Sequence, residues 1–174
     1  GEISQAQPPL EAFLDKHQMK LIALAAILAV FAVCYVVYQG LEESAAQSAG
    51  NALVSSEDIM GYQSIVNNHS GTAAAYSAKI LLAEEQWKDG QEDDSIQSLR
   101  NFIESESSHP ARPSAQASLA AKLESQGKID EAEKIFTDLT DDPAASYLAP
   151  YAWISLGDLR LEKGDAEAAT AAYE

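Results

Sequence analysis

The sequence predicts an all-α protein with one N-terminal transmembrane helix followed by a solenoid of stacked helical hairpins. Three observations support this prediction. Hydrophobic residues make up 47% of the chain but aromatic residues only 7%, and alanine, the strongest helix former, supplies much of the difference. An uncharged apolar run extends from Leu21 to Tyr38. Three glycines, Gly90, Gly127 and Gly164, recur at a spacing of 37 residues.

Composition excludes several classes of function. The 174 residues include 11 Lys and Arg against 27 Asp and Glu, a formal net charge of −16. This balance argues against nucleic acid as a partner, because phosphate contacts need a cluster of cations. A single cysteine, Cys34, cannot form an intramolecular disulfide, and three scattered histidines argue against a zinc site.

The N-terminal part consists of a short tail, residues 1–18, and a transmembrane signal anchor, residues 19–39. Pro8 and Pro9 indicate a disordered start. The eighteen residues Leu21–Tyr38 span roughly 27 Å as a helix, close to the ~30 Å hydrocarbon core of a bilayer. A cleaved signal peptide would have a shorter apolar centre, and a soluble core helix is rarely apolar on every face. A further alternative is that the signal is cleaved and the repeats form a soluble domain.

Charge bias predicts the orientation of this segment. Lys16 and Lys20 precede the apolar run Leu21–Tyr38, and the next Lys or Arg along the chain is Lys79. Positively charged flanks stay on the cytoplasmic side, so we expect a cytoplasmic N-terminus and an exported C-terminal domain. In a Gram-negative bacterium this corresponds to a single-pass protein of the inner membrane with its repeats in the periplasm.

Residues 40–71 read as a helical connector or cap. We expect one helix continuing from the membrane segment and a short second helix ending near Asn68, where the sequence NHSG interrupts the pattern. The apolar residues of this stretch would pack the two helices onto the first repeat. They are Leu53, Ile59, Ile65 and Val66.

Residues 72–174 contain three repeats, each centred on one of the periodic glycines. At offsets −8, −7, +5 and +9 from the glycine stand an aliphatic residue, two small residues and a large apolar residue. In the third repeat these are Leu156, Gly157, Ala169 and Tyr173, preceded by Trp153 at −11; in the second they are Leu119, Ala120, Ala132 and Phe136; in the first they are Leu82, Ala83, Ser95 and Leu99. This pattern resembles the tetratricopeptide repeat, in which the small residues allow close helix contact and the large one fills the space between pairs.

The period of 37 residues exceeds the usual 34, so we expect longer loops between repeats. These loops contain ESESSHPARP and DDPAASYLAP, in which Asp142 is predicted to cap a helix begun by Pro143. Glu174 falls part-way through the predicted second helix of the third repeat, so we expect this repeat to be incomplete here or completed by residues beyond Glu174.

The arrangement of a short tail, one signal anchor and an acidic repeat domain resembles the YfgM-like family of bacterial inner-membrane proteins. The segment NNHSGTAAAYSAKILLAEEQWKDGQEDDSIQSLRNFI, residues 67–103, is similar to the opening of that family's repeat domain. The resemblance implies an ancillary subunit of the Sec translocon that associates with periplasmic chaperones. The N-terminal segment here is longer and contains prolines, which departs from the family pattern.

No catalytic, cofactor-binding or metal-binding motif is present in the sequence. There is no nucleophile elbow, HExxH, P-loop or dinucleotide fingerprint, and Glu92, Asp93 and Asp94 lack the spacing of an EF-hand. His69 and His109 fall in loops and are expected at the surface. The sequence therefore predicts a non-enzymatic protein without a cofactor.

The predicted binding site is a groove formed by the first helix of each repeat. Its residues are Ile80, Glu84 and Trp87 in the first repeat, Ala117, Ala121 and Glu124 in the second, and Tyr151, Ile154, Asp158 and Leu161 in the third. Such a groove would be apolar with an acidic edge, suited to a peptide or helix with hydrophobic anchors and flanking Lys or Arg. The partners expected are translocon subunits, export chaperones or client polypeptides.

The alternative is a structural component of a secretion, pilus or cell-wall assembly that associates with copies of itself. An uncapped final hairpin would expose apolar surface for such stacking. The mass of the repeat domain as a function of its concentration distinguishes the two functions.

Overall fold

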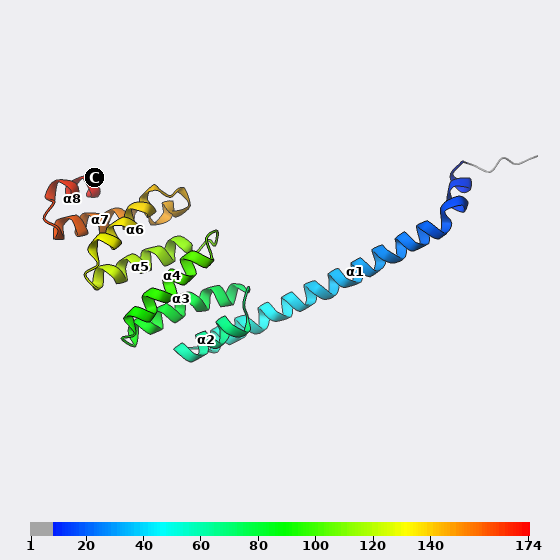
Figure 1. Ribbon diagram of the computed structural model, residues 1–174, viewed down its shortest axis with the longest axis horizontal. Helices are drawn as coiled ribbons and strands as arrows, with labels where there is room; N and C mark the ends of the chain where they lie inside the picture. Colours follow the sequence, from blue (N-terminus) through cyan, green and yellow to red (C-terminus); the bar gives the residue numbers. More distant parts are fainter. Residues whose placement is uncertain (1–8) are drawn as a thin grey trace, which may run out of the picture. The chain divides into compact units, whose positions relative to one another are not determined.

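The computed structural model describes residues 9–174, except for the side chains of residues 9–16, 18, 21–23, 25 and 26. Every regular element in that range is helical (Figure 1), which confirms the predicted all-α class. The helices are α1 (Pro9–Ser55), α2 (Ile59–Asn68), α3 (Ala73–Lys88), α4 (Glu92–Ser105), α5 (Arg112–Ser125), α6 (Ile129–Asp141), the 3-10 helix η1 (Pro143–Leu148), α7 (Ala149–Glu162) and α8 (Ala166–Tyr173). The chain divides into two compact units, Gly1–Gln47 and Ser48–Glu174, and the division falls within α1.

The first unit consists mainly of α1, whose described side chains between residues 27 and 40 are all exposed. They include large apolar side chains such as Phe31, which is 69% exposed, and Val36, which is 66% exposed. By length and composition, the portion Ile27–Ser55 is a helix that could cross a membrane. An 18-residue window of this portion has a mean hydropathy of 1.3, and none of that window is buried. A signal sequence has the same properties. Residues 1–8 of the predicted tail lie outside the described residues.

The second unit contains three helical hairpins, α3–α4, α5–α6 and α7–α8, each packed against the next (Figure 1). α2 packs against α3 and ends at Asn68. A single hydrophobic cluster runs through the hairpins from Ala83 to Ala172, and Phe102, Leu123, Phe136 and Leu156 are among its fully buried members. This arrangement is the predicted solenoid of stacked hairpins.

The three periodic glycines form the same turn in every hairpin. Gly90, Gly127 and Gly164 have φ angles of 77°, 74° and 80°, a left-handed conformation that a side chain disfavours. In each turn the amide after the glycine donates to a carbonyl five residues earlier, as in Lys128 N–H to the Leu123 oxygen at 2.8 Å. This Schellman motif ends the first helix of the pair and directs the chain into the second.

The small residues predicted at the +5 position lie where the two helices of each hairpin touch. Ser95 is 0%, Ala132 is 0% and Ala169 is 1% exposed. The serine is accommodated because its hydroxyl donates a hydrogen bond to the carbonyl oxygen of Ala83 on the facing helix, at 2.5 Å. A buried hydroxyl without such an acceptor would cost free energy of folding.

The connection between the second and third repeats is more ordered than the predicted loop. Pro143–Leu148 form the 3-10 helix η1, and Asp142 caps it as predicted, because its Oδ1 accepts the amide hydrogen of Ala144 at 2.8 Å. Proline at the first position suits this role, since its missing N–H would have no acceptor there. Ala145 is fully buried and fixes η1 to the hairpins.

Candidate functional site

The residues of the predicted groove all lie on the first helix of each hairpin. Ile80, Glu84 and Trp87 belong to α3, Ala117, Ala121 and Glu124 to α5, and Tyr151, Ile154, Asp158 and Leu161 to α7. Their environments differ from repeat to repeat. Those of α3 and α5 are buried or half-buried, whereas the four on α7 are exposed.

Glu84 and Trp87 of the first repeat belong to a polar cluster with side chains of the second repeat, and this cluster joins α3 to α5. The Lys122 ammonium lies 2.9 Å and 3.0 Å from the two carboxylate oxygens of Glu84, and the Ser118 hydroxyl donates to the same carboxylate at 2.7 Å. Lys122 Nζ also lies 5.1 Å from the centre of the Trp87 ring, a cation–π contact. These side chains therefore hold neighbouring repeats together.

The electrostatics of this cluster favour the charged form of Glu84. Burial acts to raise the pKa of Glu84, but the hydrogen bonds from Ser118 and Lys122 outweigh burial and hold the pKa below its ordinary value. The Lys122 side chain is only 9% exposed, whereas that of Glu84 is 38% exposed. The carboxylate thus offers one face to water and the other to a buried ammonium.

Between the second and third repeats, Glu124 of α5 lies near two acids of α7. Burial raises the pKa of Glu124, and the negative charges of Glu162 and Asp158 raise it further. Asp158 also accepts a hydrogen bond from the hydroxyl of Tyr173 at 2.7 Å. The acids predicted for the edge of the groove thus lie on α5 and α7.

Among the residues predicted to line the groove, the exposed apolar ones lie in the third repeat. Tyr151 is 44%, Ile154 56% and Leu161 51% exposed. The rings of Tyr151 and Phe136 of α6 pack in a T-shaped arrangement with their centres 5.7 Å apart, so only part of the Tyr151 ring is free. By contrast, Ala117 is buried at 7% exposure.

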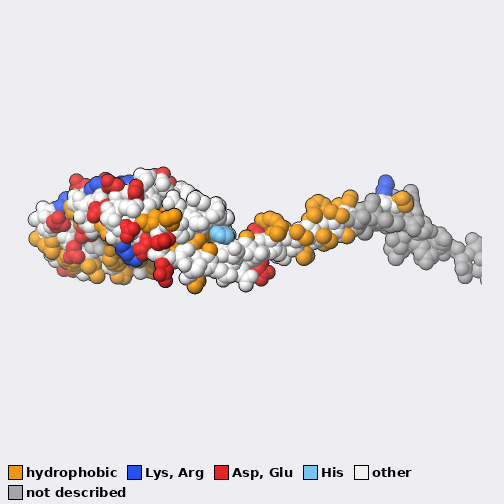
Figure 2. All heavy atoms as spheres, turned by 90° about the horizontal axis from the view of Figure 1, so that it is seen from below, with side chains coloured by type: hydrophobic (Ala, Val, Ile, Leu, Met, Phe, Trp, Pro, Cys, Tyr) orange, Lys and Arg blue, Asp and Glu red, His pale blue; other side chains and the backbone are white. Residues whose placement is uncertain are grey.

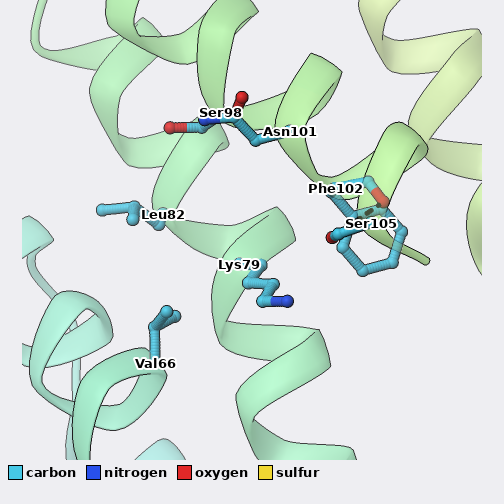
Figure 3. A pocket seen from close by; sticks show the side chains of 7 residues that line it. All are labelled: Val66, Lys79, Leu82, Ser98, Asn101, Phe102 and Ser105. Carbon is cyan, nitrogen blue, oxygen red and sulfur yellow. Dashed lines mark hydrogen bonds between the residues drawn. The ribbon is translucent and has the colours of Figure 1, made fainter. Parts of the chain in front are cut away.

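A second concavity lies between α2, α3 and α4 (Figure 3). This pocket has a volume of about 170 Å³, enough for a side chain or two of a ligand. Val66, Leu82 and Phe102 supply apolar lining, and Ser98, Asn101 and Ser105 of α4 supply polar groups. Lys79, at its edge, is paired with Glu106 at 2.6 Å, and this hydrogen bond lowers the pKa of Glu106.

Sequence reasoning missed Lys122 and Ser118, although a signal for them exists. The two residues stand four apart on α5 and follow Glu84 by about one repeat, so they face it across the repeat boundary. It also missed the packing of His109, whose ring lies 4.7 Å from that of Tyr76 and 5.6 Å from that of Phe102. His109 is half-buried in an aromatic cluster.

Acidic side chains outnumber basic ones in the second unit. Figure 2 shows acidic side chains spread over its visible face among apolar and basic ones, and apolar side chains along the exposed part of α1. Within the part of the chain that the structure describes, no three His, Cys, Asp or Glu side chains are grouped so that they could hold a metal ion. The arrangement suits recognition of a polypeptide by apolar and charged contacts.

Comparison with known proteins agrees with this geometry. The profile of the family described as "Tetratricopeptide repeat-like domain" matches residues 11–174. Among solved structures, the chain is similar to a Podospora anserina protein described as a kinesin light chain with nearly identical TPR-like repeats, at 15% identity and a TM-score of 0.53 over 77% of this chain and 70% of that one. This likeness concerns the fold. No curated protein matches the chain.

Proposed function

This chain belongs to the family of tetratricopeptide repeat-like domains, and from that premise we propose that it is a membrane-anchored scaffold for export proteins. Repeats of this kind form protein–protein interaction scaffolds and are typically non-enzymatic. In the proposal, α1 anchors the chain in a bacterial inner membrane and the repeats act outside the cytoplasm. They serve the Sec translocon and its chaperones as an accessory factor.

The observation that carries the anchoring is the exposure of α1. An 18-residue apolar window of that helix has no buried share, although apolar surface of this extent is costly in water. A bilayer would remove that cost, and Lys16 and Lys20 before the window favour a cytoplasmic N-terminus. Anchoring would raise the local concentration of the repeats beside a membrane partner.

The specific partner is supported by the resemblance of residues 67–103 to the YfgM-like family and by the character of the repeat surface. Exposed apolar side chains on α7, Tyr151, Ile154 and Leu161, lie on the same helix as the acids Asp158 and Glu162. This combination suits polypeptide segments with hydrophobic anchors beside Lys or Arg.

Site-specific crosslinking in native membranes tests this function. A photoreactive residue is placed at Tyr151 on α7, and a matched control is placed at Lys134, an exposed residue of α6. We expect translocon subunits or export chaperones among the adducts from position 151 and far fewer from position 134. Adducts only with the protein itself, or with an unrelated envelope assembly, would refute the translocon role.

The topology is tested separately by fusing alkaline phosphatase after Glu174. The enzyme is active only outside the cytoplasm, so we expect active fusions in the intact chain. Reversing the charges of Lys16 and Lys20 to Glu should reduce that activity. High activity in a cytoplasmic green fluorescent protein fusion at the same position would contradict the proposed orientation.

A further inference from the structure

The period of 37 residues, longer than the usual 34, leaves room for extended connections between the repeats. Residues 106–111 join α4 to α5, and the 3-10 helix η1 joins α6 to α7. These two parts of the chain meet beside α5. The hydroxyl of Ser114, near the start of α5, lies 3.0 Å from that of Tyr147 in η1, and Ala145 of η1 is fully buried. The connections therefore form one ordered structure.

A pocket of about 390 Å³, which we call the connection pocket, lies between the two connections and the start of α5. Its apolar lining comes from Pro110, Pro113, Ala144 and the ring of Tyr147, and its polar lining from Ser107, Ser108, His109, Arg112 and Asp142. The pocket shares no residue with the predicted groove or with the concavity between α2, α3 and α4. Its volume is in the range of sites for small organic molecules.

Arg112 differs from the other cations of the second unit. Residues 48–174, all of which the structure describes, contain nine Lys and Arg, and seven of these form ion pairs with Asp or Glu. The other two are Arg112, which is half-buried, and Lys128, which is exposed. A cation withdrawn from water is normally paired with an anion. Arg112 therefore stands in the pocket as a cation without a counter-charge.

The hydrogen bonds of Arg112 position its guanidinium without neutralising it. Nε donates to the carbonyl oxygen of Ile103 at 3.3 Å, near the end of α4, and Nη1 donates to Oε1 of Gln116 at 3.5 Å. Nη2 donates to no residue in the described part of the chain. Asp142, the acid in the lining, forms no ion pair with Arg112 among these contacts and uses Oδ1 to accept the amide hydrogen of Ala144.

The connection between α4 and α5 adds further donors to the pocket. Within residues 9–174, neither the amide groups nor the hydroxyls of Ser107 and Ser108 form a hydrogen bond with another residue. Hydroxyls and amide N–H groups both donate to anionic oxygens. The connection pocket thus combines a positioned guanidinium, uncommitted donors and apolar surface.

We propose that the connection pocket binds a small organic anion, namely a carboxylate or phosphate group attached to an apolar body. The planar guanidinium of Arg112 offers the N–H groups of its terminal nitrogens to the anionic oxygens, which suits both kinds of group. Pro110, Pro113 and Tyr147 receive the apolar body. The inference goes beyond the proposed scaffold function and depends neither on membrane anchoring nor on the translocon.

The charge of the second unit favours an organic anion over an inorganic one. Residues 48–174 contain 22 Asp and Glu against nine Lys and Arg, so their summed field repels anions. Asp142 in the lining adds a local repulsion. Attraction to a single guanidinium must therefore be supplemented by burial of apolar surface, which the prolines and the tyrosine ring provide.

Three probes with the same ring, benzoate, phenyl phosphate and the neutral benzamide, test the proposal. Each is titrated into the full chain in nonionic detergent, in a phosphate-free buffer at constant ionic strength. The Nε–H signals of the arginines are followed by NMR, and that of Arg112 is assigned by its loss in Arg112→Gln. We expect a saturable shift of the Arg112 signal with both anions and little shift with benzamide. Arg100 and Arg160, which are paired with Glu131 and Glu133, serve as internal controls.

Charge variants identify the groups involved, with the backbone amide signal of Ser108 as the measure of affinity in every variant. Arg112→Gln should weaken both anions at least about tenfold. Lys128→Gln, the same charge change at the other cation without an ion pair, should leave both affinities unchanged. Asp142→Asn retains a capping oxygen and removes a like charge, so it should strengthen binding about threefold or more. This variant keeps the test decisive if Arg112→Gln unfolds the start of α5.

The ratio of the two affinities identifies the anion, and either order supports the proposal. Tighter binding of phenyl phosphate indicates a phosphate ester as the ligand, and tighter binding of benzoate indicates a carboxylate. Three results would overturn the proposal: no shift of Arg112 with either anion, equal affinity for benzamide, or affinities that are unchanged in both Arg112→Gln and Asp142→Asn. Because purified protein is used, these results are independent of crosslinking to the translocon.

Discussion

The ion pair between Lys122 and Glu84 should stabilise the repeat stack asymmetrically, and the asymmetry can be measured. Glu84→Gln keeps the shape of the side chain and its contact with Ser118 but leaves the Lys122 ammonium, on a side chain 9% exposed, without its counter-charge. Lys122→Met keeps much of the apolar stem and leaves Glu84, 38% exposed, with Ser118 and water as partners.

The burial of each partner sets the expected magnitude. Removing one partner of a fully buried ion pair costs about 3–5 kcal/mol, because the other charge is left in a poor solvent. Partial access to water and the Trp87 ring at 5.1 Å reduce this, so we expect Glu84→Gln to lower the free energy of unfolding by about 2–3 kcal/mol. Lys122→Met should lower it by less than about 1 kcal/mol, since a half-exposed carboxylate can be hydrated. The double variant should resemble Lys122→Met.

Urea unfolding of the full chain in nonionic detergent, followed by tryptophan fluorescence, measures these free energies. A pH series adds a second readout. Because the folded-state pKa of Glu84 is lowered, the pair stabilises the fold above the ordinary glutamate pKa of about 4.3, and that stabilisation is lost as pH falls through the lowered value. The deficit of Glu84→Gln relative to the wild type should therefore shrink below about pH 4. Equal losses for the two single variants, or a larger loss for Lys122→Met, would refute the reasoning.

Two further predictions concern single residues of the second unit. Gly127→Ala should lower the free energy of unfolding by about 1–2 kcal/mol, because Gly127 has a φ of 74° with no neighbouring atom within 4 Å of an added Cβ. The control Gly50→Ala, in α1, should raise the free energy of unfolding by about 0.5–1 kcal/mol. If both variants lowered the free energy of unfolding equally, the turn conformation would not be the cause. Glu124→Gln should stabilise the fold at neutral pH, because the raised pKa of Glu124 destabilises its charged form in the folded state. This gain in stability should be absent below about pH 4 and should grow as pH rises through the raised pKa. The control Glu104→Gln, at an exposed position, should show no such gain. Denaturant titrations from about pH 3 to 8 measure both variants.

The repeat pattern contained most of the information on the fold. A glycine every 37 residues, with small and large apolar residues at fixed offsets, was enough to predict the hairpins, because those positions are constrained by backbone conformation and helix contact. The loop before α7 was less predictable. Pro143 and Asp142 indicated a helix start, but burial of Ala145 against the hairpins is a tertiary contact that helps to hold a 3-10 helix there.

Much less of the candidate site than of the fold could be predicted from the sequence. Groove positions were assigned to the first helices by analogy among repeats, yet Glu84 and Trp87 engage Lys122, whereas their equivalents two repeats later, Asp158 and Leu161, are exposed. Their spacing in the sequence is the same. What differs is whether another hairpin contacts them. The periodicity within one repeat does not reveal contacts between hairpins.

The helices, their turns and one uncharged apolar segment could be read from the amino-acid sequence alone. These properties depend on local conformational preference and hydrophobic period, which each stretch of about a dozen residues expresses on its own. Which acidic and aromatic side chains join the repeats, and which remain exposed, depends on how the hairpins pack. That division arises because burial and ion pairing at Lys122 and Glu84 require surfaces from two hairpins at once, whereas Ile154 and Leu161 of α7 remain exposed.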